Sequence, residues 1–217
     1  ADLFITGQFY GVDTITAVSN GSQIMHMMTV IIVGLAMGTT VTIGHSVGAK
    51  CMEQAEKIIG NTITLFMGIA VAFTVILVVL VKPIVVLIAA PQEAVAGTSI
   101  YLLICFIGIP FITAYNIISS IFRGLGDSKS PMYFIGIACV MNIALDYLFM
   151  GAFHMGAAGA ALGTVCAQTF SVLVALWVIR RRKTGISLKK SDFKIERAVI
   201  GQVLKIGIPV ALQDGFI

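Results

Sequence analysis

The chain has 217 residues, of which 58% are hydrophobic and only 11% are charged, and its mean hydropathy is +1.01. A soluble domain carries about 25% charged residues, so this composition excludes a soluble globular protein and indicates an integral membrane protein. The net charge of +4 does not indicate nucleic-acid binding, because the charges fall in short loops between hydrophobic runs.

Seven hydrophobic stretches follow one another along the chain. A spanning helix needs about 20 mainly apolar residues, and five of the stretches are that long. The first and last stretches are shorter and are predicted to be partial helices. Helices are expected because backbone polar groups in lipid must be satisfied within the segment. In chain order, the predicted helices cover residues 1–7, 22–44, 58–82, 97–121, 132–152, 157–179 and 199–217.

Basic residues alternate between successive connections. The connections 45–57, 122–131 and 180–198 carry lysines and arginines, whereas the intervening connections carry none apart from Lys82 at the border of one. This pattern obeys the positive-inside rule and predicts that the three basic connections are cytoplasmic. Segment 180–198 is the longest and most polar of them. It is predicted to be either a linker between two halves or simply a long basic loop.

Small residues and prolines mark expected packing points. Gly34 and Gly38, and likewise Gly159 and Gly163, have the GxxxG spacing that lets two helices approach closely. We interpret both pairs as packing sites within the chain, and dimerisation is the alternative.

Asp146 is the clearest ionisable residue inside a predicted helix. Asn142 precedes it by four residues and therefore lies on the same helix face. Asp2 lies near the outer end of the first predicted helix, at a similar depth. A charge at the bilayer centre costs at least roughly 2.5–3.5 kcal/mol on insertion scales, so we expect the two carboxylates to share a polar pocket in the bundle interior. This arrangement favours a proton or cation site, and the alternative is an Asp that only stabilises helix packing.

Other polar residues at membrane depth are consistent with a cavity. Thr164 and Gln168 share one face of the 157–179 helix, and Asn116 and Ser119 lie in the 97–121 helix. Each could contribute to a substrate cavity or form hydrogen bonds between helices.

Enzyme signatures are missing from the sequence. The three histidines form no HExxH motif, and no nucleophile, base and orienting group can be combined into a triad. The four cysteines form no CxxC pair and indicate neither a disulfide nor a metal framework. We therefore expect no enzyme activity, no cofactor and no nucleic-acid partner.

Five stretches in order and spacing resemble the multidrug and toxic compound extrusion (MATE) family of transporters. They are ADLFITGQ (1–8), GLAMGTTVTIGHSVGAK (34–50), IFRGLGDSKSPM (121–132), NIALDYLFM (142–150) and GAAGAALGTVCAQ (156–168). The resemblance implies an all-α membrane protein with twelve helices in two six-helix lobes. This chain resembles the first lobe without most of its first helix. The first lobe would cover residues 1–195, and the basic linker 180–198 would connect it to the second lobe. Residues 196–217 would then begin the second lobe.

The resemblance also implies a set of site residues. On the family pattern, Asp2, Asn142, Asp146 and Thr164 line the cavity of the first lobe and take part in proton or sodium coupling. Sodium would bind at Asp2 and Asp146. The fourth helix of the family often offers an Asn to this cavity, and Ser119 stands at that position here.

The implied function is a secondary antiporter in a bacterial inner membrane. It would export organic cations, drugs or toxic metabolites in exchange for protons or sodium. Its expected partners are an organic substrate, the lipid bilayer and a second lobe, without which the chain should transport nothing. One alternative is a lipid-linked oligosaccharide flippase of the same superfamily, although no basic residue is visible at mid-membrane. Another alternative is a passive channel.

Overall fold

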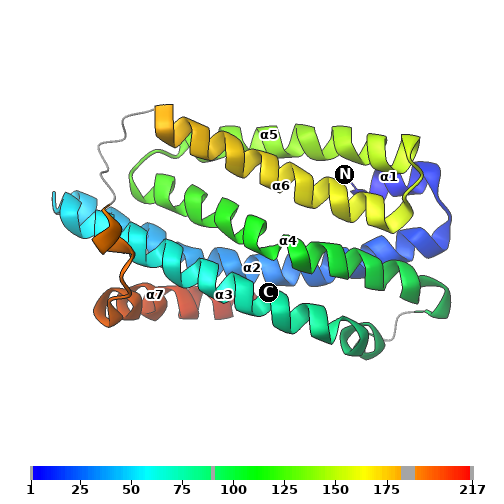
Figure 1. The fold of residues 1–217 in the computed structure, drawn as a ribbon, viewed down its shortest axis with the longest axis horizontal. Coiled ribbons are helices and arrows are strands. Elements are labelled where there is room, and N and C mark those ends of the chain that lie inside the picture. The colour runs from blue at the N-terminus through cyan, green and yellow to red at the C-terminus, as the bar shows by residue number, and fades with distance from the viewer. Residues whose placement is uncertain (1, 89–90, 182–188, 216–217) are drawn as a thin grey trace. The chain divides into compact units, whose positions relative to one another are not determined.

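The computed structural model describes residues 2–88, 91–181 and 189–215. Within these ranges every element is helical and no strand occurs (Figure 1). The fold class predicted from the sequence, an all-α membrane protein, is confirmed. The elements are α1 (Asp2–Phe9), α2 (Val12–Gly48), α3 (Met52–Leu87), α4 (Gln92–Gly124), α5 (Lys129–Asp146), the π-helix η1 (Tyr147–Ala152), α6 (Gly156–Arg181), the 3-10 helix η2 (Lys190–Phe193) and α7 (Arg197–Gly215).

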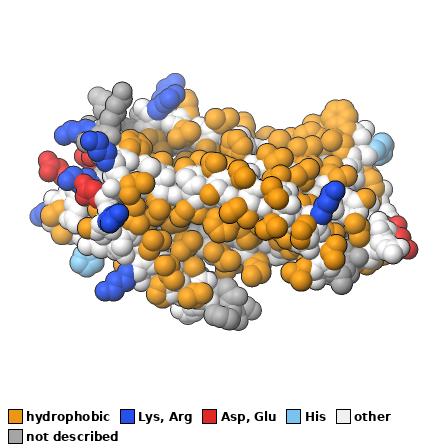
Figure 2. All heavy atoms as spheres, turned by 60° about the horizontal axis from the view of Figure 1, so that its bottom comes forward, with side chains coloured by type: hydrophobic (Ala, Val, Ile, Leu, Met, Phe, Trp, Pro, Cys, Tyr) orange, Lys and Arg blue, Asp and Glu red, His pale blue; other side chains and the backbone are white. Residues whose placement is uncertain are grey.

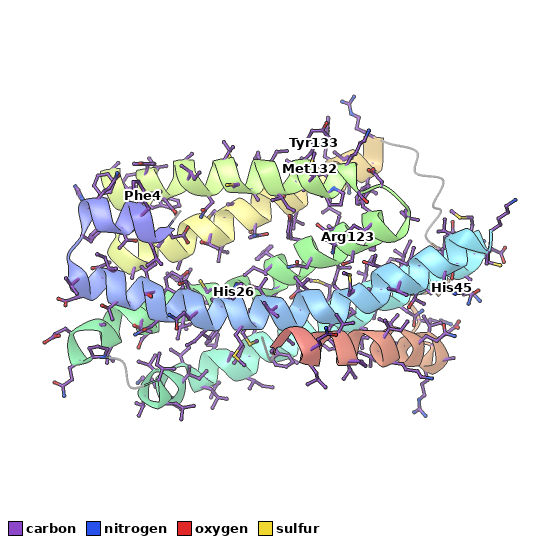
Figure 3. All side chains as sticks on the ribbon, turned by 180° about the vertical axis from the view of Figure 1, so that it is seen from behind. Phe4, His26, His45, Arg123, Met132 and Tyr133 are labelled. Carbon is purple, nitrogen blue, oxygen red and sulfur yellow. The ribbon has the colours of Figure 1, made fainter. Side chains whose placement is uncertain are left out.

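Five helices of the described chain are long and apolar enough to cross a membrane: α2, α3, α4, α5 together with η1, and α6. They match the five complete spanning stretches expected from hydropathy. Large apolar side chains remain exposed on them, as lipid-facing residues would, and Figure 2 shows hydrophobic side chains over most of the visible face. Met132 and Tyr133, which Figure 3 labels at the start of α5, are each 62% exposed.

The helices are longer than hydropathy predicted. α2 begins at Val12, so most of the expected connection 8–21 is helical, and α3 runs from Met52 to Leu87 rather than over 58–82. The physical reason is that hydropathy marks only the apolar part of a helix, whereas the backbone hydrogen bonds continue into polar turns. Within the expected linker 180–198, residues 182–188 lie outside the described residues.

The chain divides into two compact units. Unit 1 comprises Ala1–Met27, Val71–Ile112 and Gly136–Ser171, and it contains α1, η1 and parts of α2 to α6. Its close helix contacts depend on glycines. A methyl group on Gly97 would meet the side chain of Ala17, and one on Gly108 would overlap with Val165. Unit 1 contains most of the residues that the sequence predicts at the functional site.

Unit 2 comprises Met28–Ala70, Thr113–Ile135 and Val172–Ile217. One of its apolar clusters is formed by side chains from α2, α3, α4 and α7, including Ile43, Phe66, Ile117 and Val203. Within this unit α2 and α7 approach closely, because a methyl group on Gly38 would overlap with the carbonyl oxygen of Val203. The Gly34–Gly38 pair therefore packs against a neighbouring helix of the same chain.

The segment around η2 is attached to α3 in unit 2. Asn61 is 1% exposed, and its Nδ2 donates to the carbonyl oxygen of Asp192 at 3.2 Å. Its Oδ1 accepts a hydrogen bond of 2.6 Å from the backbone N–H of Glu196. Thr64 donates a further hydrogen bond to the carbonyl oxygen of Phe193 at 3.1 Å. These bonds fix the start of α7 to α3.

Candidate functional site

The candidate site lies in unit 1, where α1, the C-terminal end of α5 and the first half of α6 meet. Figure 1 shows α1 beside the end of α5 and the start of α6, and α1 contacts η1 directly. Asp2 begins α1, Asn142 and Asp146 lie in the last turns of α5, and Thr164 lies in α6. The fold thus brings together the four residues that the sequence placed at the coupling site.

Three of the four residues form a directional chain of hydrogen bonds. Nδ2 of Asn142 donates to Oγ1 of Thr164 at 3.4 Å, and the same hydroxyl donates to Oδ2 of Asp2 at 3.1 Å. A hydroxyl group can accept and donate at the same time, which is the role that Thr164 has here. The chain of bonds connects α5 to α1 through α6.

Asp146 is fully buried, and its nearest polar partner is a second carboxyl group, that of Asp2. Its exposed fraction is 0%, and no N–H or O–H group of the described residues donates to either of its oxygens. The nearby carboxyl group of Asp2 interacts with it electrostatically. Two ionised carboxylates buried side by side are costly, because desolvation and mutual repulsion both oppose their charges.

A glycine makes the space for Asp146. A methyl group on Gly163 of α6 would overlap with Oδ1 of Asp146, so the carboxyl group would have to move away from this helix if residue 163 were larger. The backbone also changes at this point. Asp146 is the last residue of α5, and the six-residue π-helix η1 follows it. Such π segments are rare and occur frequently at functional sites.

Two residues of α4 complete the surroundings of the acid pair. Tyr101 is 2% exposed and Cys105 is 1% exposed, and the two side chains interact with each other. The phenol group of Tyr101 interacts electrostatically with both Asp2 and Asp146. A methyl group on Gly21 of α2 would overlap with the ring of Tyr101, so this glycine makes room for the ring.

The other end of α1 is held by a second polar contact. The hydroxyl group of Tyr10 donates to the carbonyl oxygen of Met150 at 3.0 Å and accepts from the N–H of Gly156 at 2.9 Å. It thereby connects the residues after α1 to the end of η1 and the start of α6. The ring of Phe9 also packs edge-on against Tyr147, with 6.1 Å between the ring centroids. Both ends of α1 are thus attached to α6 and to the segment formed by α5 and η1.

Sequence reasoning missed Tyr101, Gly163 and Tyr10. Tyr101 lies in the hydrophobic stretch 97–121, where an aromatic residue is ordinary. Gly163 was identified only as half of a GxxxG pair. No sequence signal identifies the contact partners of these three residues, although a tyrosine within a spanning stretch is a weak indication of a buried hydrogen bond.

The three residues expected to line a substrate cavity belong to different units of the chain. Gln168 belongs to unit 1, and its Oε1 is buried without a donor among the described residues. Asn116 and Ser119 belong to unit 2 and are 8% and 4% exposed.

The residues at the site fit a proton or a small hard cation better than a transition metal. Among the described residues no three His, Cys, Asp or Glu side chains lie together as a metal site. The available donors are instead carboxylate and hydroxyl oxygens, from Asp2, Asp146 and Thr164. Oxygen ligands suit hard cations.

Known proteins resemble this chain over nearly its whole length. The model of the MatE family matches residues 1–148. The chain is 33% identical to "Probable multidrug resistance protein YpnP" of Bacillus subtilis (strain 168), over 95% of this chain and 46% of that protein. It is 28% identical to "Probable multidrug resistance protein YoeA" of the same organism, over 97% of this chain and 47% of that protein.

Solved structures share the fold. The inward-facing and the outward-facing conformations of a multidrug resistance MATE family transporter of the MOP superfamily each superpose with a TM-score of 0.91 at 24% sequence identity. Each match covers 98% of this chain and 48% or 47% of that transporter. The chain therefore spans about half the length of the curated relatives and structures that it matches.

Proposed function

The chain belongs to the MatE family, as its motifs indicated, and from this premise we propose that it forms one lobe of a secondary antiporter. The complete transporter would export organic cations, drugs or toxic metabolites in exchange for protons or sodium ions. The curated relatives with multidrug resistance names support drug export, and the five apolar helices make the chain a multi-pass membrane protein.

The state of Asp146 is the observation that carries the proposal. A carboxyl group that only stabilises helix packing would form hydrogen bonds to its neighbours. Instead no N–H or O–H group of the described residues donates to the buried oxygens of Asp146, and their partner is a second carboxyl group, on α1. Two ionised carboxylates in this position would repel each other, and the Thr164 hydroxyl group, which donates to Asp2, compensates the charge of Asp2 alone. A proton or a cation held between Asp2 and Asp146 removes that cost.

Loading and unloading of this site would alter the attachment of α1. When a proton or cation is present, Asp2 and Asp146 attract the same positive charge and hold α1 against α5. When it leaves, the two negative charges repel, and the hydrogen bond from Thr164 to Asp2 still connects α6 to the start of α1. Burial favours the neutral form of a carboxyl group and a bound cation favours the ionised form, so both coupling ions are chemically compatible.

If sodium is the coupling ion, Asp2 and Asp146 would hold it with the help of the Thr164 hydroxyl group. The ion would supply positive charge and no covalent chemistry. Asn142 would keep the Thr164 hydroxyl oriented, since its Nδ2 occupies one lone pair of that oxygen. If the coupling ion is a proton, the same carboxyl pair would share it.

The topology and the division of the chain belong to the same proposal. We place the connections 45–57, 122–131 and 180–198 in the cytoplasm, residues 1–195 in the first lobe and residues 196–217 at the start of the second. Alternating access requires two lobes that rock against each other, so this lobe alone should not transport. A bacterial inner membrane is the proposed location.

The test measures dye export by a complete two-lobe transporter that contains this chain, in vesicles with a proton gradient alone and then a sodium gradient alone. We expect export under one gradient, and Asp146→Asn should abolish it while membrane insertion stays normal. Ser99→Ala is a matched control, because Ser99 on α4 is only partly buried and its hydroxyl group donates to the carbonyl oxygen of Val95 in its own helix. Normal export by Asp146→Asn would refute the proposed role, and export without any gradient would indicate a passive channel.

A further inference from the structure

A pocket that the coupling site does not use lies in unit 2, between the end of α2 and the start of α7. The two helices are in backbone contact at Gly38 and Gly207, since a methyl group on Gly207 would overlap with the carbonyl oxygen of Leu35. One turn further along α2, Thr42 and His45 line a cavity of about 280 Å³ together with Lys205 of α7. Figure 3 labels His45 near the end of α2, beside α7.

The pocket combines positive charge with apolar walls. His45 and Lys205 are its two basic residues, and no acidic residue lines it. Neither His45 nor Lys205 forms an ion pair within the part of the chain that the structure describes. Val41 and Ile206 add apolar surface, and Gln54 and Gln202 add amide groups. Such a lining suits an anion with an adjoining apolar part.

The size and position of the pocket limit which ligands it can hold. Its volume is slightly below the range of roughly 300–1,000 Å³ for drug-sized sites, so it fits a head group better than a drug. α2 has 37 residues and is about 55 Å long, which exceeds the hydrocarbon core of about 30 Å. Its last turns, with His45, therefore lie where lipid head groups lie. Basic pockets between helices at this level bind phosphate-bearing head groups.

A second pocket next to the first one limits where the anion can bind. The two pockets share Gln54 and Gln202, but Glu53 and Glu196 line the second one together with Lys57. Two carboxylates there would repel a phosphate group. The anion is thus restricted to the side of His45 and Lys205.

We propose that the pocket between α2 and α7 binds a phosphate ester, held by His45 and Lys205. The phosphate belongs either to an anionic phospholipid whose chains lie along Val41 and Ile206, or to a soluble phosphate ester from the aqueous phase. Bound there, the ligand connects α2 to the first turns of α7. The binding site is independent of the ion-coupling role of Asp146.

The test follows the accessibility of His45. Diethyl pyrocarbonate modifies accessible imidazole groups, and His154, which lies between η1 and α6, provides an internal reference in the same molecule. The chain is reconstituted into vesicles of phosphatidylcholine, of phosphatidylcholine with phosphatidylglycerol, or of phosphatidylcholine with glycerol phosphate added to the buffer. Peptide mass spectrometry then gives the modification rate of each histidine.

We expect an anionic ester to slow modification of His45 and to leave His154 unchanged. Protection by phosphatidylglycerol alone would identify a lipid, and equal protection by glycerol phosphate would identify a soluble ester. Lys205→Gln should lower the affinity for the protecting ester by about fivefold, since one basic residue near a membrane surface contributes about that factor. Lys194→Gln makes the same charge change outside both pockets and should have no effect. Absence of selective protection in every arm, or unchanged protection in Lys205→Gln, would overturn the proposal.

Discussion

Replacing Thr164 by valine tests whether its hydroxyl group is the link between α5 and α1. Valine has nearly the same shape as threonine but can neither donate nor accept a hydrogen bond. The substitution therefore removes the bond from Asn142 at 3.4 Å and the bond to Asp2 at 3.1 Å without leaving a cavity. Thr164→Ser is the matched control, because it keeps the hydroxyl group.

The expected magnitude follows from these two bonds. A hydrogen bond to a charged group contributes about 1.5–3 kcal/mol and a neutral one about 0.5–1.5 kcal/mol. Thr164 is only partly buried and the Asn142 bond is long, so the lower part of the combined range applies. We expect Thr164→Val to reduce the free energy of unfolding by about 2 kcal/mol. If the same link positions Asp2 for the coupling ion, the apparent ion affinity should fall by about 30-fold, since each 1.4 kcal/mol is a factor of ten.

Two measurements check this prediction. Circular dichroism during titration with a denaturing detergent gives the change in unfolding free energy of the chain. The ion concentration for half-maximal dye export by the two-lobe transporter gives the apparent affinity. Thr164→Ser should stay close to the parent protein in both. A Thr164→Val protein with unchanged ion affinity would show that the chain of hydrogen bonds does not position Asp2.

Other substitutions probe other parts of unit 1 and unit 2. Gly163→Ala should disturb Asp146 and reduce coupled export at least about fivefold, through an overpacking cost of about 1–3 kcal/mol, whereas Gly136→Ala in α5, where the added methyl group meets nothing, should export normally. Equal export by the two alanine variants would disprove a role for the glycine at 163. Asn61→Ala leaves the N–H of Glu196 without its acceptor, so hydrogen exchange of that amide, followed by mass spectrometry, should accelerate at least about tenfold. Unchanged exchange at Glu196 would mean that Asn61 does not hold the start of α7.

Much of the fold could be predicted because the energetic cost of polar groups in lipid is so large. That cost fixes helices as the only form for the long apolar runs and makes Asp146 conspicuous among them. The spacing of Asn142 and Asp146 gave their common face, the matching depth of Asp2 suggested a shared pocket, and the family resemblance assigned Thr164 to the same site. The structure brings all four together, and their role in coupling remains a proposal.

The parts that could not be predicted depend on contacts between distant segments. The space that Gly163 leaves for Asp146 exists only once α5 and α6 are packed together, and the contact of Tyr101 with the acid pair needs α4 beside α1. The π-helix after Asp146 has no sequence signal, since one additional residue per turn leaves the hydrophobic pattern almost unchanged. Helix ends were also misjudged, because hydropathy does not report where polar turns stop.

The double hydrogen bond of Tyr10 sets how α1 can move. Its hydroxyl group bonds to the carbonyl oxygen of Met150 in η1 and to the N–H of Gly156 at the start of α6. This end of α1 is therefore attached to the turn between η1 and α6. The opposite end, about 12 Å away along eight residues, carries Asp2. A displacement of Asp2 that preserves both hydrogen bonds of Tyr10 would therefore turn α1 about that residue, and its angle would be limited by how far one short helix can swing before the phenol loses either partner.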